Sequence, residues 1–216
     1  MRAAERGFLL LSSHLGDPLR KPLTAPQLRN LFLRIQTLER TAEDRDLELH
    51  DLKRMGYSLD MSERILSLLA EEKLLRDYLK SAEQFDCYPI TRVSEGYPLQ
   101  LRKRLGLDSP GCLWVKGDAS LLLQPAVALV GSRDLRAENR AFAREVGRQA
   151  ALQGYVLISG NARGADRCAQ ESCLEAGGQV ISVVADELYK QPERDRILYV
   201  SEDGFGEAFS AIRALS

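Results

Sequence analysis

The sequence has few of the residues that build metal and redox sites. Its 216 residues include two histidines, four cysteines and one tryptophan. No two cysteines form a C-x-x-C pair, and His14 and His50 lie far from all four in the sequence. Because a zinc site needs clustered ligands, we expect no metal. Four scattered thiols fit a reducing, cytoplasmic setting. Cys168 and Cys173 fall on different sides of one predicted helix, so both are predicted to be packing residues.

Long apolar runs are also missing. No segment approaches the about 18–20 apolar residues of a membrane-spanning helix. The run Phe8–Leu11 follows Arg2 and Arg6, as in a signal peptide. It is too short for the apolar core of a signal, and no small-residue cleavage pattern follows it. We therefore expect a first core helix there and no membrane association.

Motifs of common enzymes are absent as well. The sequence has no G-x-S-x-G elbow, no Walker A loop, no recognisable pair of catalytic carboxylates and no H-x-E…C-x-x-C deaminase pattern. The G-x-G-x-x-G fingerprint of dinucleotide-binding turns is missing too. No motif in the sequence therefore compels an enzyme, and NAD binding has no support at these turns.

Charge is nearly balanced over the chain but unevenly spread. The net charge is −1. Residues 97–170 carry 11 basic and 6 acidic groups, a local excess of +5, whereas residues 171–216 carry 4 basic and 9 acidic groups. The positive segment holds both of the glycine-rich turns described below, which makes an anionic ligand the natural candidate for them.

Residues 1–84 are predicted to form a helical N-terminal domain. Apolar residues recur at three- and four-residue spacing from Leu28 to Leu38, after Thr24 as a predicted N-cap. Ser62 is predicted to cap one long helix that continues to Leu79. Such a domain either packs on the rest of the chain or binds DNA or a partner protein, and no basic face decides between these readings.

Residues 85–216 are predicted to form a Rossmann-like, doubly wound and mostly parallel α/β sheet. The predicted strands are residues 85–91, 112–118, 127–130, 155–158, 179–184 and 198–201, and the main helices are residues 135–152, 164–176 and 207–215. Strands that are apolar almost throughout indicate parallel strands covered on both faces, so residues 127–130 are expected to be buried. Trp114 is expected to be a packing residue rather than a stacking platform.

Two strand-to-helix turns carry the predicted site. Each has glycine, serine and arginine, and adjacent turns of this kind can face one crevice at the carboxyl edge of a sheet. Glycine allows close backbone approach, free amides and a hydroxyl can donate to phosphate, and arginine offers a planar fork. Alternatively, the glycines only allow tight turns and the arginines are only solvated. The predicted phosphate-binding residues are Gly131, Ser132, Arg133, Ser159, Gly160, Asn161, Arg163 and Gly164.

Three further residues are predicted to support these turns. Asp166 lies in the first turn of the second helix, where it either caps amides or holds the ligand. Arg136 and Arg140 begin a stripe of arginines and are the members near enough to the first turn to meet a ligand. Opposite the stripe, Phe142, Val146 and Ala150 are predicted to face the core.

These segments resemble a known family. VALVGSR, LISGNARGAD and GGQVISVVAD, preceded by GYPLQLRKRL and CLWVKGD, are similar to motifs of the DprA/Smf DNA-processing proteins over residues 86–185. The resemblance implies single-stranded DNA binding in a basic pocket, transfer of that DNA to a RecA-type recombinase during natural transformation, a homodimer and no cofactor. Arg133 and Arg163 match the family's DNA-contacting basic positions.

The chain departs from the family pattern at several places. Asn161 replaces the usual leucine, and Gln170 replaces the usual histidine. The chain stops at Ser216, before the family's R-N-R motif. The resemblance therefore implies that the Rossmann-like domain, residues 85–216, is incomplete at its C-terminus.

The hypothesis from the sequence is a cytoplasmic, non-enzymatic single-stranded DNA-binding protein. A nucleotide-sensing module that uses the same crevice is the first alternative. A nucleotide phosphoribohydrolase is disfavoured because Gly177-Gly178 lacks the threonine and glutamate of that family's P-G-G-x-G-T-x-x-E motif. An interaction protein whose helical half is the active part is the remaining alternative.

Overall fold

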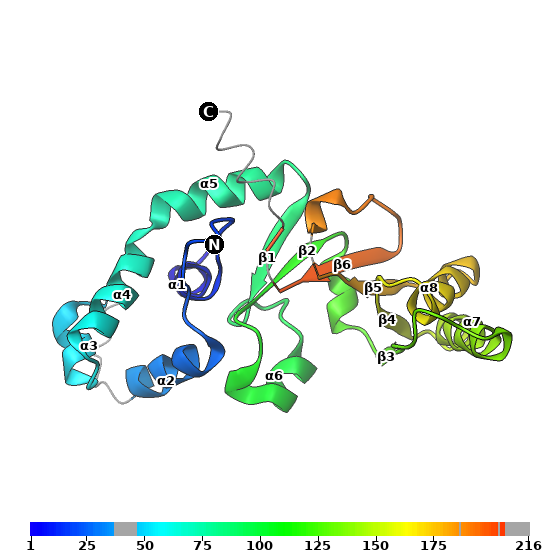
Figure 1. The fold of residues 1–216 in the computed structure, drawn as a ribbon, viewed down its shortest axis with the longest axis horizontal. Helices are drawn as coiled ribbons and strands as arrows, with labels where there is room; N and C mark the ends of the chain where they lie inside the picture. Colours follow the sequence, from blue (N-terminus) through cyan, green and yellow to red (C-terminus); the bar gives the residue numbers. More distant parts are fainter. Residues whose placement is uncertain (37–46, 186, 203, 206–216) are drawn as a thin grey trace.

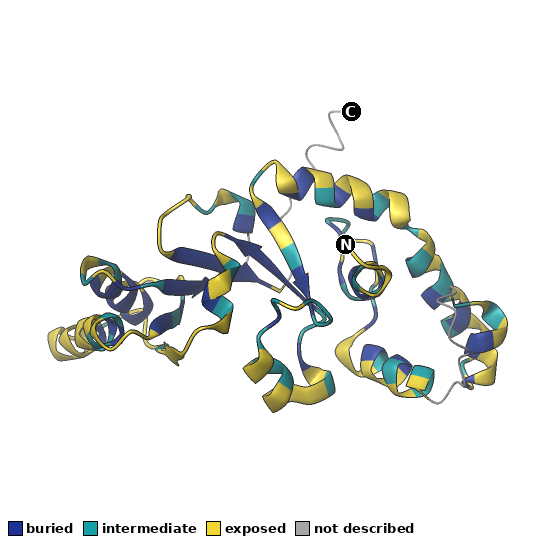
Figure 2. Ribbon diagram, turned by 180° about the vertical axis from the view of Figure 1, so that it is seen from behind, coloured by how far each residue is buried: buried dark blue, intermediate teal, exposed yellow. Residues whose placement is uncertain are grey.

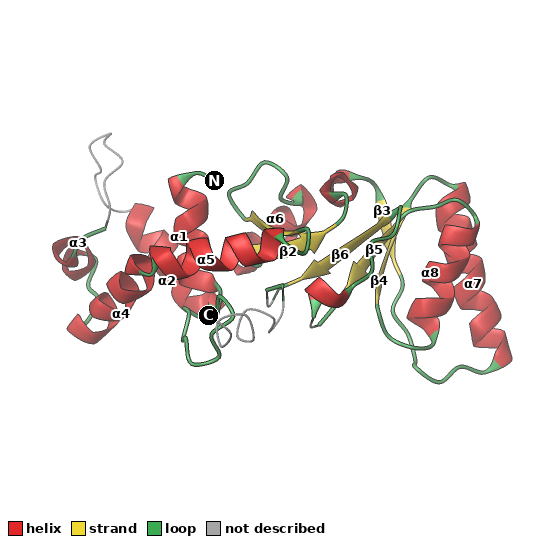
Figure 3. Ribbon diagram, turned by 90° about the horizontal axis from the view of Figure 1, so that it is seen from above, coloured by secondary structure: helices red, strands yellow, loops and turns green. Residues whose placement is uncertain are grey.

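The helical N-terminal part and the sheet form one elongated molecule in the computed structural model (Figure 1). The structure describes residues 1–36, 47–185, 187–202 and 204–205. The N-terminal helices are α1 (Ala3–Ser12), α2 (Ala25–Gln36), α3 (Leu49–Arg54), α4 (Leu59–Ala70) and α5 (Glu72–Glu83). Seen from above, they lie at one end and α7 (Ala137–Leu152) and α8 (Ala165–Glu175) lie at the other, with the sheet between them (Figure 3).

One six-stranded sheet has the order β1-β2-β6-β5-β4-β3. Its strands are β1 (Cys87–Thr91), β2 (Cys112–Lys116), β3 (Ala126–Ala128), β4 (Val156–Gly160), β5 (Val180–Val183) and β6 (Ile197–Ser201). β3, β4, β5 and β6 run parallel, whereas β2 is antiparallel to both β1 and β6. The predicted Rossmann-like, mostly parallel sheet is therefore confirmed.

Shorter helices complete the described chain. α6 (Leu99–Leu105) and the 3-10 turn η1 (Gly106–Asp108) connect β1 to β2, η2 (Ala119–Leu123) follows β2, and η3 (Leu188–Lys190) follows β5. Asp118 caps η2, because its side chain accepts a hydrogen bond from the Ser120 amide at 2.9 Å. The predicted helix at residues 207–215 and Leu38 lie outside the described residues.

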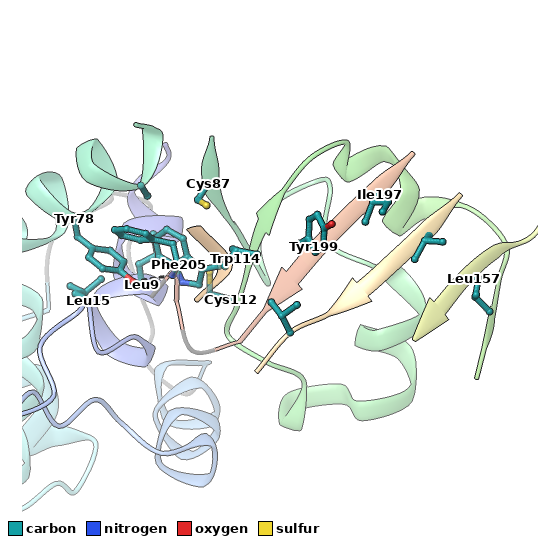
Figure 4. Packing of buried hydrophobic residues seen from close by; sticks show 14 of the residues in the cluster. Leu9, Leu15, Tyr78, Cys87, Cys112, Trp114, Leu157, Ile197, Tyr199 and Phe205 are labelled. Carbon is teal, nitrogen blue, oxygen red and sulfur yellow. Dashed lines mark hydrogen bonds between the residues drawn. The ribbon is translucent and has the colours of Figure 1, made fainter. Parts of the chain in front are cut away.

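The main core joins the helical part to the sheet (Figure 4). The rings of Tyr78 and Trp114 meet edge to face at 5.0 Å between centroids, and Phe205 lies 4.5 Å from Tyr78. The Phe205 amide also donates to the Tyr78 hydroxyl at 3.2 Å. All three side chains are buried, so Trp114 is a packing residue, as predicted. The division into two domains after residue 84 stays a prediction.

The N-terminal helices follow the sequence pattern with one exception. Phe8–Leu11 is buried in α1 as a core helix, and Thr24 accepts from the Gln27 amide at the start of α2. The long helix predicted from Ser62 to Leu79 is wrong. Ser58 caps α4 instead, and the chain breaks at Glu71 before α5 begins. Ser62 is buried inside α4, where its hydroxyl donates to the Ser58 carbonyl.

The predicted burial of residues 127–130 is also wrong. β3 forms the outer edge of the described sheet, and all three of its residues are exposed (Figure 2). Val130 is 80% exposed. On α7, Phe142 is 68% exposed, so it does not face the core as predicted. α7 instead packs on α8 through small residues, because a side chain at Gly147 would overlap the backbone of Ala169.

The described residues contain no helix long and apolar enough to cross a membrane. All four cysteines are buried and unpaired with one another. Burial raises the pKa of Cys87 to about 11 and raises the pKa of Cys112 and Cys173 as well. Cys168 and Cys173 lie on α8 in packed positions, in agreement with the sequence.

Candidate nucleic-acid interface

The two predicted turns touch each other at the carboxyl edge of the sheet. Gly131–Asp134 follows β3, and Asn161–Gly164 follows the neighbouring strand β4. The Ala165 amide at the start of α8 donates to the Ser132 carbonyl at 3.0 Å. Gly164 has a φ of +98°, and a Cβ there would lie 2.6 Å from the Arg133 carbonyl oxygen. The contact therefore requires glycine both for its backbone conformation and for its lack of a side chain.

Asp166 joins the two turns from beneath. Its buried carboxylate accepts a hydrogen bond from the Gly131 amide at 3.3 Å. A Cβ on Gly160 would lie 2.5 Å from the second carboxylate oxygen, and a Cβ on Gly131 would lie 2.6 Å from that of Ala165. Two of the predicted glycines thus make room for α8 and its first acidic residue. This geometry places Asp166 inside the protein rather than on the exposed face of the turns.

Buried polar groups hold the ends of the strands in place. The Ser159 hydroxyl donates to the Leu129 carbonyl at 2.8 Å, which ties β4 to the chain after β3. The side chain of Gln170 donates to the Gly160 carbonyl and, at 3.3 Å, to the Ser182 hydroxyl. Gln170 supports the second turn through its contact with the Gly160 carbonyl. The hydroxyl of Ser159 is therefore already used within the fold.

The first turn leaves donors free on its exposed side. The Ser132 hydroxyl donates to the Asp134 carbonyl at 2.9 Å and accepts from the Asp134 amide, which closes a small local turn. Within the described residues, the amides of Ser132 and Arg133 have no acceptor. Both residues are exposed. Two backbone N–H groups therefore point at neither a strand nor a side chain and are available to an anion.

The two predicted arginines differ in their surroundings. Arg163 forms an ion pair with Asp134, with 2.9 Å between guanidinium nitrogen and carboxylate oxygen. Both side chains are largely exposed, at 77% and 89%. Arg133 has no ion-pair partner in the part of the chain that the structure describes. The side-chain amide of Asn161 donates to the side-chain oxygen of Gln191 at 3.2 Å, so the Asn161 side chain is directed towards the loop after β5.

The arginine stripe on α7 divides in the same way. Arg144 pairs with Glu175 of α8, and Arg148 pairs with Glu145, each at 2.7 Å. The guanidinium of Arg148 lowers the pKa of Glu145 to about 2. Arg136, the N-cap of α7, and Arg140 are exposed and have no ion pair among the described residues. The unpaired members are therefore those nearest the first turn.

The turns form an open surface. A cavity of about 510 Å³ lies elsewhere, between the N-terminal helices and the chain that leads into β2. Sequence reasoning did not identify Asp134, whose carboxylate forms an ion pair with Arg163. Its place directly after Arg133 was the available signal, but its pairing with Arg163 spans 29 residues and depends on the fold.

Together these features define a Rossmann-like protein whose carboxyl edge carries two touching turns, the first with two free amides and an arginine, Arg133, that has no ion pair among the described residues. The model of the family DNA recombination-mediator protein A matches residues 89–202, and the chain belongs to this family. Protein Smf of Escherichia coli (strain K12) is 32% identical over 137 residues, which cover 63% of this chain and 36% of that protein.

Two comparisons with DNA processing protein DprA of Streptococcus pneumoniae agree with this assignment. Its sequence is 32% identical over 125 residues, which cover 55% of this chain and 39% of that protein. Its X-ray structure superimposes with a TM-score of 0.68 at 23% identity, over 96% of this chain and 70% of that one. The structural comparison supports the shared fold. The chain spans less than half of the length of these curated relatives.

Proposed function

We propose that this chain binds single-stranded DNA at the two turns, without catalysing a reaction, in DNA processing and recombination mediation. The observation that carries the proposal is the exposed Arg133, which has no ion pair among the described residues, together with the free backbone amides of Ser132 and Arg133. Guanidinium and amide groups together recognise phosphate oxygens. Membership of a family described as recombination mediators supports a nucleic acid as the source of those phosphates.

The openness of the surface favours a polymer over a small nucleotide. Small-molecule sites enclose most of their ligand in a cavity, whereas the residues from Gly131 to Asp134 are exposed. A polymer gains affinity from several weak phosphate contacts spread over an open surface. The nucleotide-sensing alternative therefore has less support from the structure, although the same donors would bind a single phosphate.

The remaining parts of the proposal concern partners. The family description motivates transfer of bound DNA to a RecA-type recombinase, and the family resemblance motivates a homodimer. Analytical sedimentation of the chain, with and without oligonucleotide, measures directly whether it forms a homodimer. Cytoplasmic residence fits the buried free thiols.

The test is a fluorescence-anisotropy titration with a labelled thymidine dodecamer at about 50 mM salt. We expect wild-type protein to bind, Arg133→Ala to weaken binding by about tenfold or more, and Arg163→Ala to weaken it less, since Arg163 must first leave Asp134. Arg54→Ala removes an exposed arginine from α3, at the far end of the molecule, and is the matched control. Failure of the wild type to bind, or equal binding by Arg133→Ala and Arg54→Ala, would refute the proposal.

A further inference from the structure

A second basic group lies at the same edge of the sheet as the turns. β1 and β6 are both antiparallel to β2, so β1 runs in the direction of β6, β5, β4 and β3. The chain therefore leaves β1 at the carboxyl edge, and the connection to α6 begins there. The last turn of α6 contains three basic residues, Arg102, Lys103 and Arg104. Five strand spacings separate β1 from β3 in the sheet order.

The outer members of this basic group are free to meet a ligand. Lys103 and Arg104 are exposed, and neither has an ion-pair or hydrogen-bond partner among the residues that the structure describes. Leu99 and Leu105 on the same helix are also exposed, at 56% and 45%. Exposed apolar and cationic side chains side by side suit a strand of nucleic acid, which offers both phosphates and unpaired bases.

The third member, Arg102, holds the helix rather than the ligand. Its guanidinium donates to the Arg92 carbonyl at 2.7 Å and lies 5.7 Å from the centre of the Tyr97 ring. Burial of its Nε leaves that atom without a partner in the described structure. Tyr97 is itself buried and donates to the Pro110 carbonyl. The short helix is thereby fixed with its two outer cations towards solvent.

We propose that Lys103 and Arg104 extend the DNA-binding surface, so that one single strand runs along the carboxyl edge from the turns to α6. This inference rests on the proposed function. Five spacings of about 4.8 Å give an edge of roughly 24 Å. At about 3.4 Å per stacked nucleotide, the edge spans about seven nucleotides. A strand shorter than that reaches the turns or α6, and a longer strand reaches both.

The experiment compares two oligonucleotide lengths across a salt series. Lys103→Ala/Arg104→Ala is measured with a thymidine tetramer and with a thymidine dodecamer. The matched control is Lys53→Ala/Arg54→Ala, which removes an equivalent exposed Lys-Arg pair from the end of α3. Circular dichroism of each variant confirms that it is folded. Arg133→Ala reports in parallel on the turns.

For the dodecamer, we expect the α6 variant to bind about tenfold more weakly at about 50 mM salt and to lose about 1.4 from its salt slope, at about 0.7 per single-strand phosphate. For the tetramer, whose strongest site is the turns, we expect little change. If the α6 variant and the control behave alike with the dodecamer while Arg133→Ala weakens binding, this inference is wrong and the proposed function stands. If wild-type protein binds neither oligonucleotide, both fail. If α6 binds a protein partner instead of DNA, the α6 variant and the control will bind the dodecamer equally well.

Discussion

Under the proposed function, the carboxylate of Asp134 opposes DNA binding at the turns, so its neutralisation should strengthen binding. The carboxylate holds Arg163 at 2.9 Å and places a negative charge beside Arg133. Asp134→Asn removes that charge but keeps the backbone carbonyl and amide that close the local turn with Ser132. The substitution therefore changes the electrostatics of the surface without removing the contacts that shape it.

The size of the effect follows from two contributions. An exposed ion pair contributes about 0.5 kcal/mol, which Arg163 no longer has to give up on binding DNA. One carboxylate about 6 Å from a phosphate repels it by roughly 0.7 kcal/mol in water, before screening by salt. Together they give about 1 kcal/mol after screening, or about fivefold tighter binding at low salt.

The assay is the dodecamer titration, repeated for Asp134→Asn alone and in the Arg163→Ala background. We expect the full gain in the wild-type background and a smaller gain with Arg163→Ala, because only the repulsion is then relieved. Raising the salt concentration should reduce both gains. Unchanged or weaker binding by the folded Asp134→Asn variant would show that the surface carrying Asp134 does not face phosphate.

Three other predictions concern the framework. Gly164→Ala should lower the free energy of unfolding by about 3 kcal/mol in urea denaturation, because alanine combines an unfavourable φ with overlap against the first turn. The control is Gly154→Ala, at a glycine with positive φ in open space, and a smaller loss for Gly164→Ala than for this control would contradict the reasoning. Phe205→Ala should cost about 3–5 kcal/mol and shift a single unfolding transition of helices and sheet together; two separate transitions would argue against a shared core. Stability should fall between pH 9 and pH 11, because an unfolded Cys87 ionises there while burial keeps the native thiol protonated. Cys87→Ser should show a shallower fall than wild type, with the remainder due to the buried Cys112 and Cys173, and equal slopes would contradict the reasoning.

Local patterns predicted most elements of the fold but not the neighbours of each strand. β4 and the turn at Ser159-Gly160 were predictable, because an apolar run ending in glycine and serine is a local signal. The exposure of β3 was not, because its residues are as apolar as those of β4 and only the order of the whole sheet makes it an edge. Phe142 was misplaced for the same reason, since the small residues of α7 pack on α8 and leave the aromatic side chain outside.

The break between α4 and α5 shows the same limit at another place. Apolar spacing continues through Glu71, so the sequence pattern predicts one helix. In the structure, the buried Arg20 donates to the Leu68 carbonyl at 3.4 Å and pairs with Glu71 at 2.5 Å. Arg20, which contacts both sides of the break, lies about 50 residues earlier in the sequence. A rule that uses only neighbouring residues therefore cannot predict the break. The pair Arg163–Asp134 at the candidate site is non-local in the same sense.

The contact between Tyr78 and Phe205 determines when the main core can be completed during synthesis of the chain. Their backbone-to-hydroxyl hydrogen bond spans 127 residues. At a synthesis rate of about 5–20 residues per second, roughly 6–25 s pass between the addition of these two residues. Until Phe205 leaves the exit tunnel, the apolar faces of α5 and of Trp114 lack the ring that covers them. The face of α5 that carries Tyr78 is therefore completed only after Phe205 is added, and a nascent chain stalled before Phe205 exposes apolar surface that a chaperone can bind.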